Sequence, residues 1–182
     1  IKPSVPPDWY KPYEGDNRGV PAMAAFGDGY RHHVTGLIHD ELGFPTEKPN
    51  EIENFLQRLT QKITRGFPEI MMTKGYRIED ADVAIIAYGS VARSAMRAVD
   101  EARQQGIKAG LLQLITLFPF PRSHVVPILK QCRAVLVPEM NNGQISREVQ
   151  RVNQGICTVV KHNRIDGQFI TPDELHARLV KL

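Results

Sequence analysis

Four short, largely apolar runs constrain the fold of this chain more than any other feature. They span residues 83–89, 108–115, 134–139 and 157–162, and segments with helical signals separate them. Continuous apolar runs of this length are typical of strands that are buried on both faces of a parallel sheet. Parallel neighbours need crossover connections, and helices usually supply them. We therefore predict an α/β fold, a three-layer sandwich with a mainly parallel sheet.

Signals for helix ends accompany the segments between the runs. Ser90 is expected to cap the first helix, and Gly106 is expected to end it. Prolines break the chain before a short helix near residues 123–131, and Thr171 with Glu174 three residues later predicts the start of the last helix. One further helix should follow the third run, with an apolar face formed by Ile145, Val149 and Val152.

Residues 1–50 differ from the remainder because they are rich in proline and glycine and lack helical or strand periodicity. We expect them to form an extended connector that lies on another part of the protein. A structureless segment of this length is uncommon inside a compact domain. The chain begins with Ile1 rather than Met, and we therefore expect a fragment of a longer protein that lacks its N-terminal domain.

A helix is predicted directly after the connector. Asn50 and Glu53 resemble a capping box, and apolar residues recur at helical spacing after them. Gly66 and Pro68 are expected to end this helix. We place the α/β domain at residues 51–182.

Composition and charge argue against several classes of protein. The net charge is only +3, and the basic residues are scattered among acidic ones, so we expect no nucleic-acid partner and no membrane surface. No apolar run approaches the length of a membrane-spanning helix, and we expect a cytoplasmic protein. Cys132 and Cys157 are far apart and form no CxxC motif. An iron–sulfur cluster or a zinc site is therefore not expected from this chain alone.

The triplet Gly27-Asp28-Gly29 matches the beginning of a thiamine-diphosphate motif, in which an aspartate and a later asparagine ligate Mg²⁺. Asn50 and Asn54 follow at about the required distance. The genuine triplet ends a buried strand, whereas residues 21–26 form a poor strand sequence. We interpret the match as a coincidence and predict no metal site.

Several polar and aromatic residues gather shortly after this triplet. Adjacent histidines on a strand point to opposite faces, and no HExxH or HxH spacing is present, so metal binding is not favoured. We expect hydrogen bonds at an interface with a missing domain or a partner subunit. The interface candidates are Tyr30, Arg31, His32, His33, His39 and Asp40.

Two loops at the carboxyl ends of predicted strands are candidates for ligand binding. A glycine turn that enters a helix exposes backbone N–H groups to an anion, and an arginine one turn later can add a contact to a phosphate. The alternative interpretation is an ordinary tight turn and an Asn-Gly turn. No G-x-S-x-G motif is present, and we predict no catalytic residue. The candidates for an anion or coenzyme A are Tyr88, Gly89, Ser90, Arg93, Glu139, Asn141 and Asn142.

Three segments together resemble a known family. They read FGDGYRHHVTGLIHDELGFPT (26–46), DVAIIAYGSVARSAMRAVDEARQQGIKAGLLQLITLFPFP (82–121) and VLVPEMNNGQISREVQRV (135–152). They are similar to the α subunit of 2-oxoacid:ferredoxin oxidoreductases, most of all to the 2-oxoglutarate type. The resemblance implies that residues 51–182 form a domain like the transketolase C-terminal domain, preceded in the whole subunit by a thiamine-type domain.

The family resemblance also implies a reaction. The whole complex converts a 2-oxoacid, coenzyme A and oxidised ferredoxin to acyl-CoA, CO₂ and reduced ferredoxin. It uses thiamine diphosphate, Mg²⁺ and iron–sulfur clusters. The family's motifs for these groups lie in other subunits or domains, so we expect this chain alone to bind no cofactor and to be inactive.

The resemblance suggests a structural and subunit-assembly role for this chain. The implied partners are the β subunit, with γ or δ subunits as further members, and ferredoxin through the complex. The chain can also be expected to pair with a second copy of itself as a homodimer. The alternatives are a module that binds coenzyme A or an anion, or the same domain of a pyruvate or branched-chain 2-oxoacid enzyme.

Overall fold

The computed structural model describes residues 1–182 and divides them into two compact units, Ile1–Glu69 and Ile70–Leu182. This division differs from the predicted boundary at residue 50. Helix α1, over Pro49–Ile70, groups almost entirely with the N-terminal segment. Its side chains reach that segment, because Arg58 donates to the carbonyl of Gly19 at 3.0 Å and Arg65 to that of Asn17 at 3.4 Å.

The C-terminal unit contains one five-stranded sheet with the order β1-β3-β2-β4-β5. The four predicted strands are present and parallel to one another, and β1 pairs with β3 in the antiparallel direction. The predicted α/β class with a mainly parallel sheet is therefore confirmed. The strands are β1 (Thr73–Tyr76), β2 (Val83–Tyr88), β3 (Ala109–Leu114), β4 (Ala134–Glu139) and β5 (Thr158–Asn163).

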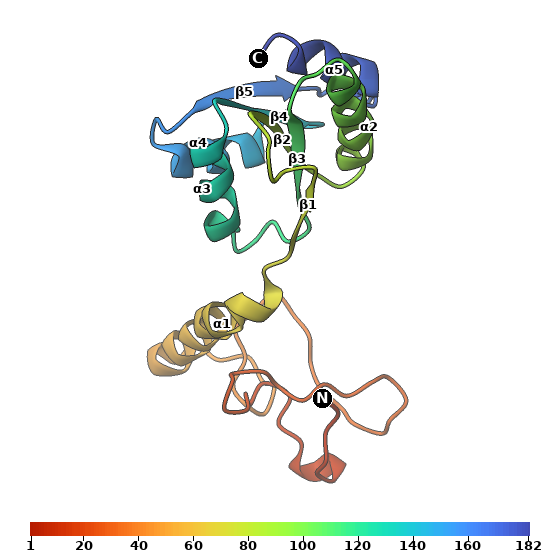
Figure 1. Cartoon of the computed structure of the whole chain (residues 1–182). Coiled ribbons are helices and arrows are strands. Elements are labelled where there is room, and N and C mark those ends of the chain that lie inside the picture. The colour runs from red at the N-terminus through yellow and green to blue at the C-terminus, as the bar shows by residue number, and fades with distance from the viewer. The chain divides into compact units, whose positions relative to one another are not determined.

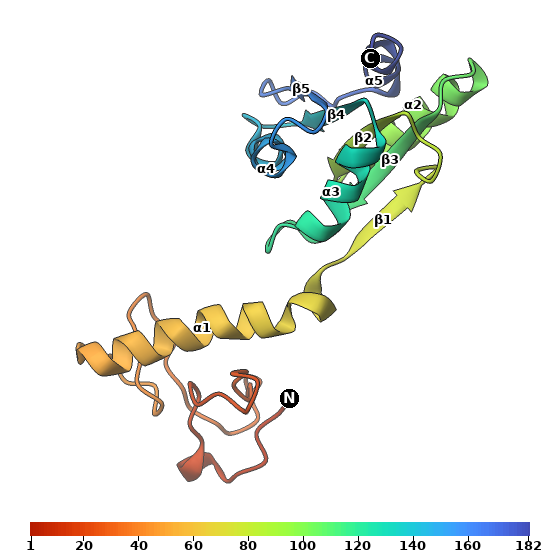
Figure 2. The same cartoon turned by 60° about the vertical axis from the view of Figure 1, so that its left-hand side comes forward.

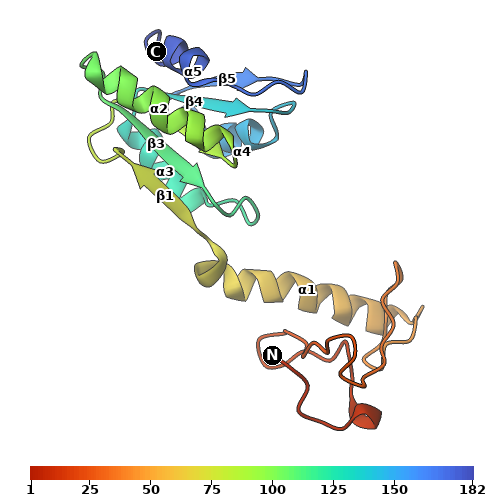
Figure 3. The ribbon, with the colours of Figure 1, turned by 90° about the vertical axis from the view of Figure 1, so that its right-hand side faces the viewer.

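Helices cover both faces of this sheet. Figures 1 and 3 show α2 and α5 on one face and α3 and α4 on the other, so the predicted three layers are present. Crossover helices on both faces are the expected result of parallel strand order. The helices are α2 (Val91–Gln104), α3 (Arg122–Gln131), α4 (Gln144–Asn153) and α5 (Pro172–Leu179).

Strand β2 shows how the sheet separates two cores. Side chains alternate along a strand, so Ile85 enters the cluster beneath α2 and α5, while Ile86 enters the cluster beneath α3 and α4. Both side chains are fully buried. Burying one isoleucine contributes about 1.5–3 kcal/mol, which explains why both faces of the central strands are apolar.

The predicted capping interactions form at one helix start and are absent at two others. Thr171 and Glu174 form the reciprocal bonds of a capping box at α5, as predicted. Ser90 occupies the position before α2, but its backbone is already helical and its side chain makes no capping bond. Asn50 does not cap α1, because the helix already begins at Pro49, and proline is favoured at a first helical position.

The predicted end of the first helix is also wrong. Helix α1 continues through Gly66 and Pro68 to Ile70. Proline lacks an N–H and removes one intrahelical bond, a loss that falls in the last turn here. None of the 22 residues of α1 is buried.

The N-terminal segment, predicted as an extended connector, consists mainly of turns and loops. It contains a short 3₁₀ helix, η1 (Pro7–Trp9), and two isolated bridges, Gly15 with Pro21 and His39 with Pro45. Figure 2 shows these loops beside α1 within the N-terminal unit. No helix in the chain combines the length and the apolar character needed to cross a membrane.

Candidate functional site

The carboxyl ends of β2 and β4 form the topological switch point of the sheet. The connection after β2 leads to β3 on one side, and the connection after β3 leads back across β2 to β4 on the other. Ligands of open α/β sheets bind at such points. The β2–β4 ladder covers only Val83–Ile85 and Ala134–Leu136, so the strands are no longer paired toward their carboxyl ends.

Three of the predicted residues meet across this switch point. The Tyr88 hydroxyl donates to Glu139 Oε1 at 3.2 Å, and Asn141 Nδ2 donates to the Tyr88 hydroxyl oxygen at 2.7 Å. Glu139 is only 1% exposed, and its carboxylate accepts the backbone N–H groups of Ile145 at 2.9 Å and Ser146 at 2.8 Å. The sequence prediction therefore placed these residues correctly at one edge of the sheet.

The arrangement is a buried helix cap rather than an open binding site. The Glu139 carboxylate faces the first turn of α4, where unpaired N–H groups and the helix dipole favour a negative charge. Burial, and then the nearby Glu139 charge, raise the pKa of the Tyr88 hydroxyl, which therefore keeps its proton and donates it. Three donors of the protein thus occupy most of the hydrogen-bonding capacity of this carboxylate.

The remaining candidates at this edge do not join the network. Gly89, Ser90 and Arg93 are exposed, and none of the chain's ion pairs includes Arg93. Asn142 instead lines a separate hollow of about 330 Å³, together with Asn141 and the Arg164 side chain. Asn141 belongs to both the network and this hollow, whereas Gly89, Ser90 and Arg93 belong to neither.

The thiamine-like triplet lies in an open turn. Asp28 is 3.6 Å from the Lys2 ammonium, and no other atoms lie within 4 Å of where side chains at Gly27 and Gly29 would begin. Asn54 lines a hollow that Asp28 does not reach. These residues do not fit a Mg²⁺ site, and the chain holds no group of three or more His, Cys, Asp or Glu that could bind a metal.

The cysteines do not fit an iron–sulfur cluster either. Cys132 is buried and its thiol donates to the carbonyl of Ala81 at 3.4 Å. Burial raises the pKa of this thiol to about 11, so it stays protonated. A cluster requires several thiolates, and this chain has two cysteines.

The predicted interface residues divide into two groups. His39 is 3% exposed, stacks on the Tyr13 ring with centroids 4.7 Å apart, and shares a 2.9 Å hydrogen bond with Thr35. Asp40 accepts the N–H of Phe44 at 2.9 Å, so it fixes the tip of its own loop.

The other interface candidates have fewer partners. Tyr30 donates to the carbonyl of Val5 at 2.7 Å. Arg31 and His33 are exposed, and Nδ1 of the half-buried His32 is buried without a partner. Exposed side chains of this group are therefore free to meet another protein surface, while His39, Asp40 and Tyr30 shape the loops that carry them.

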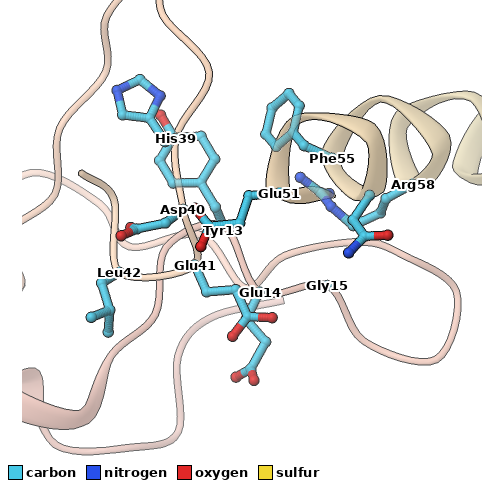
Figure 4. A pocket seen from close by; sticks show the side chains of 11 residues that line it. Tyr13, Glu14, Gly15, His39, Asp40, Glu41, Leu42, Glu51, Phe55 and Arg58 are labelled. Atoms are coloured by element: carbon cyan, nitrogen blue, oxygen red, sulfur yellow. The ribbon is translucent and has the colours of Figure 1, made fainter. Parts of the chain in front are cut away.

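A hollow of about 610 Å³ lies beside His39 in the N-terminal unit. Figure 4 shows the rings of Tyr13 and His39 next to each other, with Phe55 and Arg58 extending from α1. The Arg58 guanidinium lies over the Phe55 ring at 5.1 Å from its centroid. Phe55 and Arg58 were not predicted as site residues, although their spacing of three places them on one helix face. The hollow is also lined by Glu14, Asp40, Glu41 and Glu51.

The family model "pyruvate:ferredoxin oxidoreductase core domain II" matches residues 81–175. The 2-oxoglutarate synthase subunit KorA of Methanothermobacter thermautotrophicus is 40% identical over 99% of this chain and 48% of its own length. The ketoisovalerate oxidoreductase subunit VorB of Methanothermobacter marburgensis is 35% identical over 66% of this chain and 34% of its own. The chain therefore spans about half the length of this KorA subunit and about a third of this VorB subunit.

Two solved structures are similar to the chain. The 2-oxoglutarate:ferredoxin oxidoreductase from Magnetococcus marinus, with 2-oxoglutarate, coenzyme A and succinyl-CoA bound, has a TM-score of 0.77 and 26% identity. The match covers 94% of this chain and 30% of that one. A split-gene transketolase described as an inactive β4 tetramer has a TM-score of 0.52 and 24% identity over 59% of this chain and 40% of that one. The predicted transketolase-like fold is thus confirmed.

Proposed function

Because the chain belongs to the family of pyruvate:ferredoxin oxidoreductase core domain II, we propose that it is part of the α subunit of a 2-oxoglutarate:ferredoxin oxidoreductase. Within that complex it serves as a structural unit for subunit assembly. Relatives at about 40% identity carry the name 2-oxoglutarate synthase subunit. The similar structure from Magnetococcus marinus contains 2-oxoglutarate, coenzyme A and succinyl-CoA, which supports this substrate class.

The complex would convert 2-oxoglutarate, coenzyme A and oxidised ferredoxin to succinyl-CoA, CO₂ and reduced ferredoxin. Thiamine diphosphate supplies the carbanion chemistry when it is bound, and iron–sulfur clusters carry electrons. Neither Asp28 nor the two cysteines fit these groups. We assign the groups to other parts of the complex, such as the β subunit.

The observation that carries the assembly role is the filled switch point. In this fold a ligand would be expected between the carboxyl ends of β2 and β4. Tyr88, Glu139 and Asn141 bond to one another there, and Glu139 also caps α4. Other α/β proteins bind ligands at this position, whereas here the side chains at the same position stabilise the fold.

We expect the 182-residue chain alone to show no 2-oxoglutarate-dependent dye reduction, whereas the complete α subunit assembled with its β subunit should reduce viologen dye. The measurement compares 2-oxoglutarate, pyruvate and 3-methyl-2-oxobutanoate, each with coenzyme A. Turnover by the chain alone would refute the assembly role. A preference for pyruvate or the branched acid would refute the substrate assignment and leave the assembly role intact.

Replacing His39 by alanine is expected to weaken association of the α and β subunits by about tenfold, equivalent to about 1.4 kcal/mol. The reason is that His39 packs on Tyr13 and holds a loop that exposes apolar side chains, among them Leu37 at 62% and Phe44 at 57%. Size-exclusion chromatography across a dilution series measures association, and metal analysis runs in parallel.

The matched control is His124→Ala, because His124 is exposed and belongs to the C-terminal unit rather than to this segment. Its replacement is expected to leave subunit association unchanged. A fall in metal content with unchanged association would contradict the prediction and favour a metal site at the histidines of the N-terminal segment.

A second candidate function is a module that binds coenzyme A or another anion at the carboxyl edge of the sheet. The observation in its favour is the hollow lined by Asn142 and Arg164, with Arg93 exposed and unpaired at the same edge. Both Asp166 and Glu174 already neutralise Arg164. Calorimetry with coenzyme A tests this candidate, and an Arg93→Gln variant that binds as well as the parent would exclude Arg93 from it.

A further inference from the structure

A basic hollow runs along one face of α1 in the N-terminal unit. Arg58, Lys62 and Arg65 follow one another at helical spacing, so their side chains lie on the same face. Together with Arg18 they line a hollow of about 210 Å³. Asp16 is the one carboxylate in its lining, which therefore carries a net of three positive charges.

The cations from α1 have no acidic partner. None of the chain's ion pairs includes Arg58, Lys62 or Arg65. Asp16 is engaged elsewhere, since its Oδ1 accepts the N–H groups of Arg18 and Val20, each at 2.9 Å, and its Oδ2 lies 3.8 Å from Arg18 Nε. Neighbouring cations without counter-charges repel one another, and an added anion would relieve this repulsion.

Neutral groups hold the guanidiniums in place. Arg58 donates to the carbonyl of Gly19 at 3.0 Å, and Arg65 donates to the carbonyl of Asn17 at 3.4 Å and to Gln61 at 3.1 Å. These bonds fix orientation without cancelling charge. Burial lowers the pKa of Arg58, as expected for a cation that loses water and gains no anion.

We propose that the hollow formed by Arg18, Arg58, Lys62 and Arg65 binds a phosphate group. Several converging cations, two of them positioned guanidiniums, match the charge and the several acceptor oxygens of phosphate. The group can belong to a phosphorylated cofactor such as coenzyme A or to free phosphate. This site lies on α1, and it does not depend on the assembly role proposed for the chain.

The test is calorimetric titration of the full 182-residue chain with inorganic phosphate, adenosine 3′,5′-bisphosphate and coenzyme A. Lys62→Gln is the first variant, because the Lys62 ammonium makes no hydrogen bond or ion pair within the chain, so its loss should leave the fold intact. We expect this variant to weaken binding about tenfold, the value of one charge-assisted hydrogen bond. Binding should also weaken as salt is added.

Lys130→Gln is the matched control, since Lys130 is an exposed and unpaired lysine on α3. It removes the same charge and should leave binding unchanged. Equal binding of all three probes identifies free phosphate as sufficient, and selective binding of coenzyme A identifies a phosphorylated cofactor. Either outcome supports the site.

Two outcomes would overturn the proposal. One is no detectable binding of any probe; loss of partner-subunit association in Lys62→Gln would then point to an acidic protein surface instead. The other is an equal loss of binding in Lys62→Gln and Lys130→Gln, which would reveal only non-specific attraction. If the 2-oxoglutarate assignment is wrong, the results expected for the parent chain and its variants stay the same, because these titrations contain no 2-oxoacid.

Discussion

Replacing Glu139 by alanine should lower the free energy of unfolding of the C-terminal unit by about 3 to 5 kcal/mol. The buried N–H groups of Ile145 and Ser146 and the Tyr88 hydroxyl would all lose their acceptor. Each buried donor left without a partner costs about 1–3 kcal/mol. Urea unfolding followed by circular dichroism measures the change.

Two further variants divide this effect into its parts. Tyr88→Phe removes one hydrogen bond and should cost only about 0.5–1.5 kcal/mol. Glu139→Gln keeps the shape and one acceptor oxygen, so its cost should lie between those of the other two. A Glu139→Ala protein as stable as Tyr88→Phe would show that the helix cap contributes little.

Replacing Gly143 by alanine should lower the free energy of unfolding by about 2 to 4 kcal/mol. Gly143 precedes α4 with φ of +85°, a left-handed conformation that costs other residues about 1–2 kcal/mol. The new methyl group would also lie 2.6 Å from Ser146 Oγ and 3.0 Å from Asn163 Nδ2. Relief of such overlaps typically costs about 1–3 kcal/mol.

Gly155→Ala is the matched control for this prediction. Gly155 has a similar φ of +83°, but a side chain there would meet no atom within 4 Å. Its replacement should therefore show the conformational cost alone. Equal losses at Gly143 and Gly155 would mean that Ser146 and Asn163 move aside freely.

The three central strands could be predicted from the sequence because they are buried on both faces. The runs that became β2, β3 and β4 are visible as apolar segments for this reason. Strand β5 lies at an edge of the sheet and has no buried residue, but its Val159-Val160 pair still favours a strand. Strand β1 was missed because it lies at the edge of the sheet and reads Thr-Lys-Gly-Tyr, without an apolar pattern. Its pairing depends on β3, which follows much later in the chain, so no local signal could reveal it.

The position of the candidate site could be predicted from the sequence, but the role of its side chains could not. Strand ends of a parallel sheet meet at one edge, and this rule brought Tyr88 and Glu139 together correctly. Whether a carboxylate there faces a ligand or a helix depends on tertiary packing, here the approach of α4. The basic hollow was missed although Arg58, Lys62 and Arg65 recur at helical spacing within the predicted helix. Only the approach of Arg18 to these residues depends on tertiary folding.

The apolar character of β2 has a consequence for folding specificity. A one-residue slip of this strand would exchange Ile85 and Ile86 between the two cores, and each core would still receive an isoleucine. Hydrophobic patterning normally selects strand register. Here it hardly distinguishes the native register of β2 from one shifted by a single residue. Tyr88 is different, because a slip would turn its hydroxyl to the opposite face, away from Glu139. The polar contacts of one side chain at the end of the strand thus favour the native register over a register shifted by one residue.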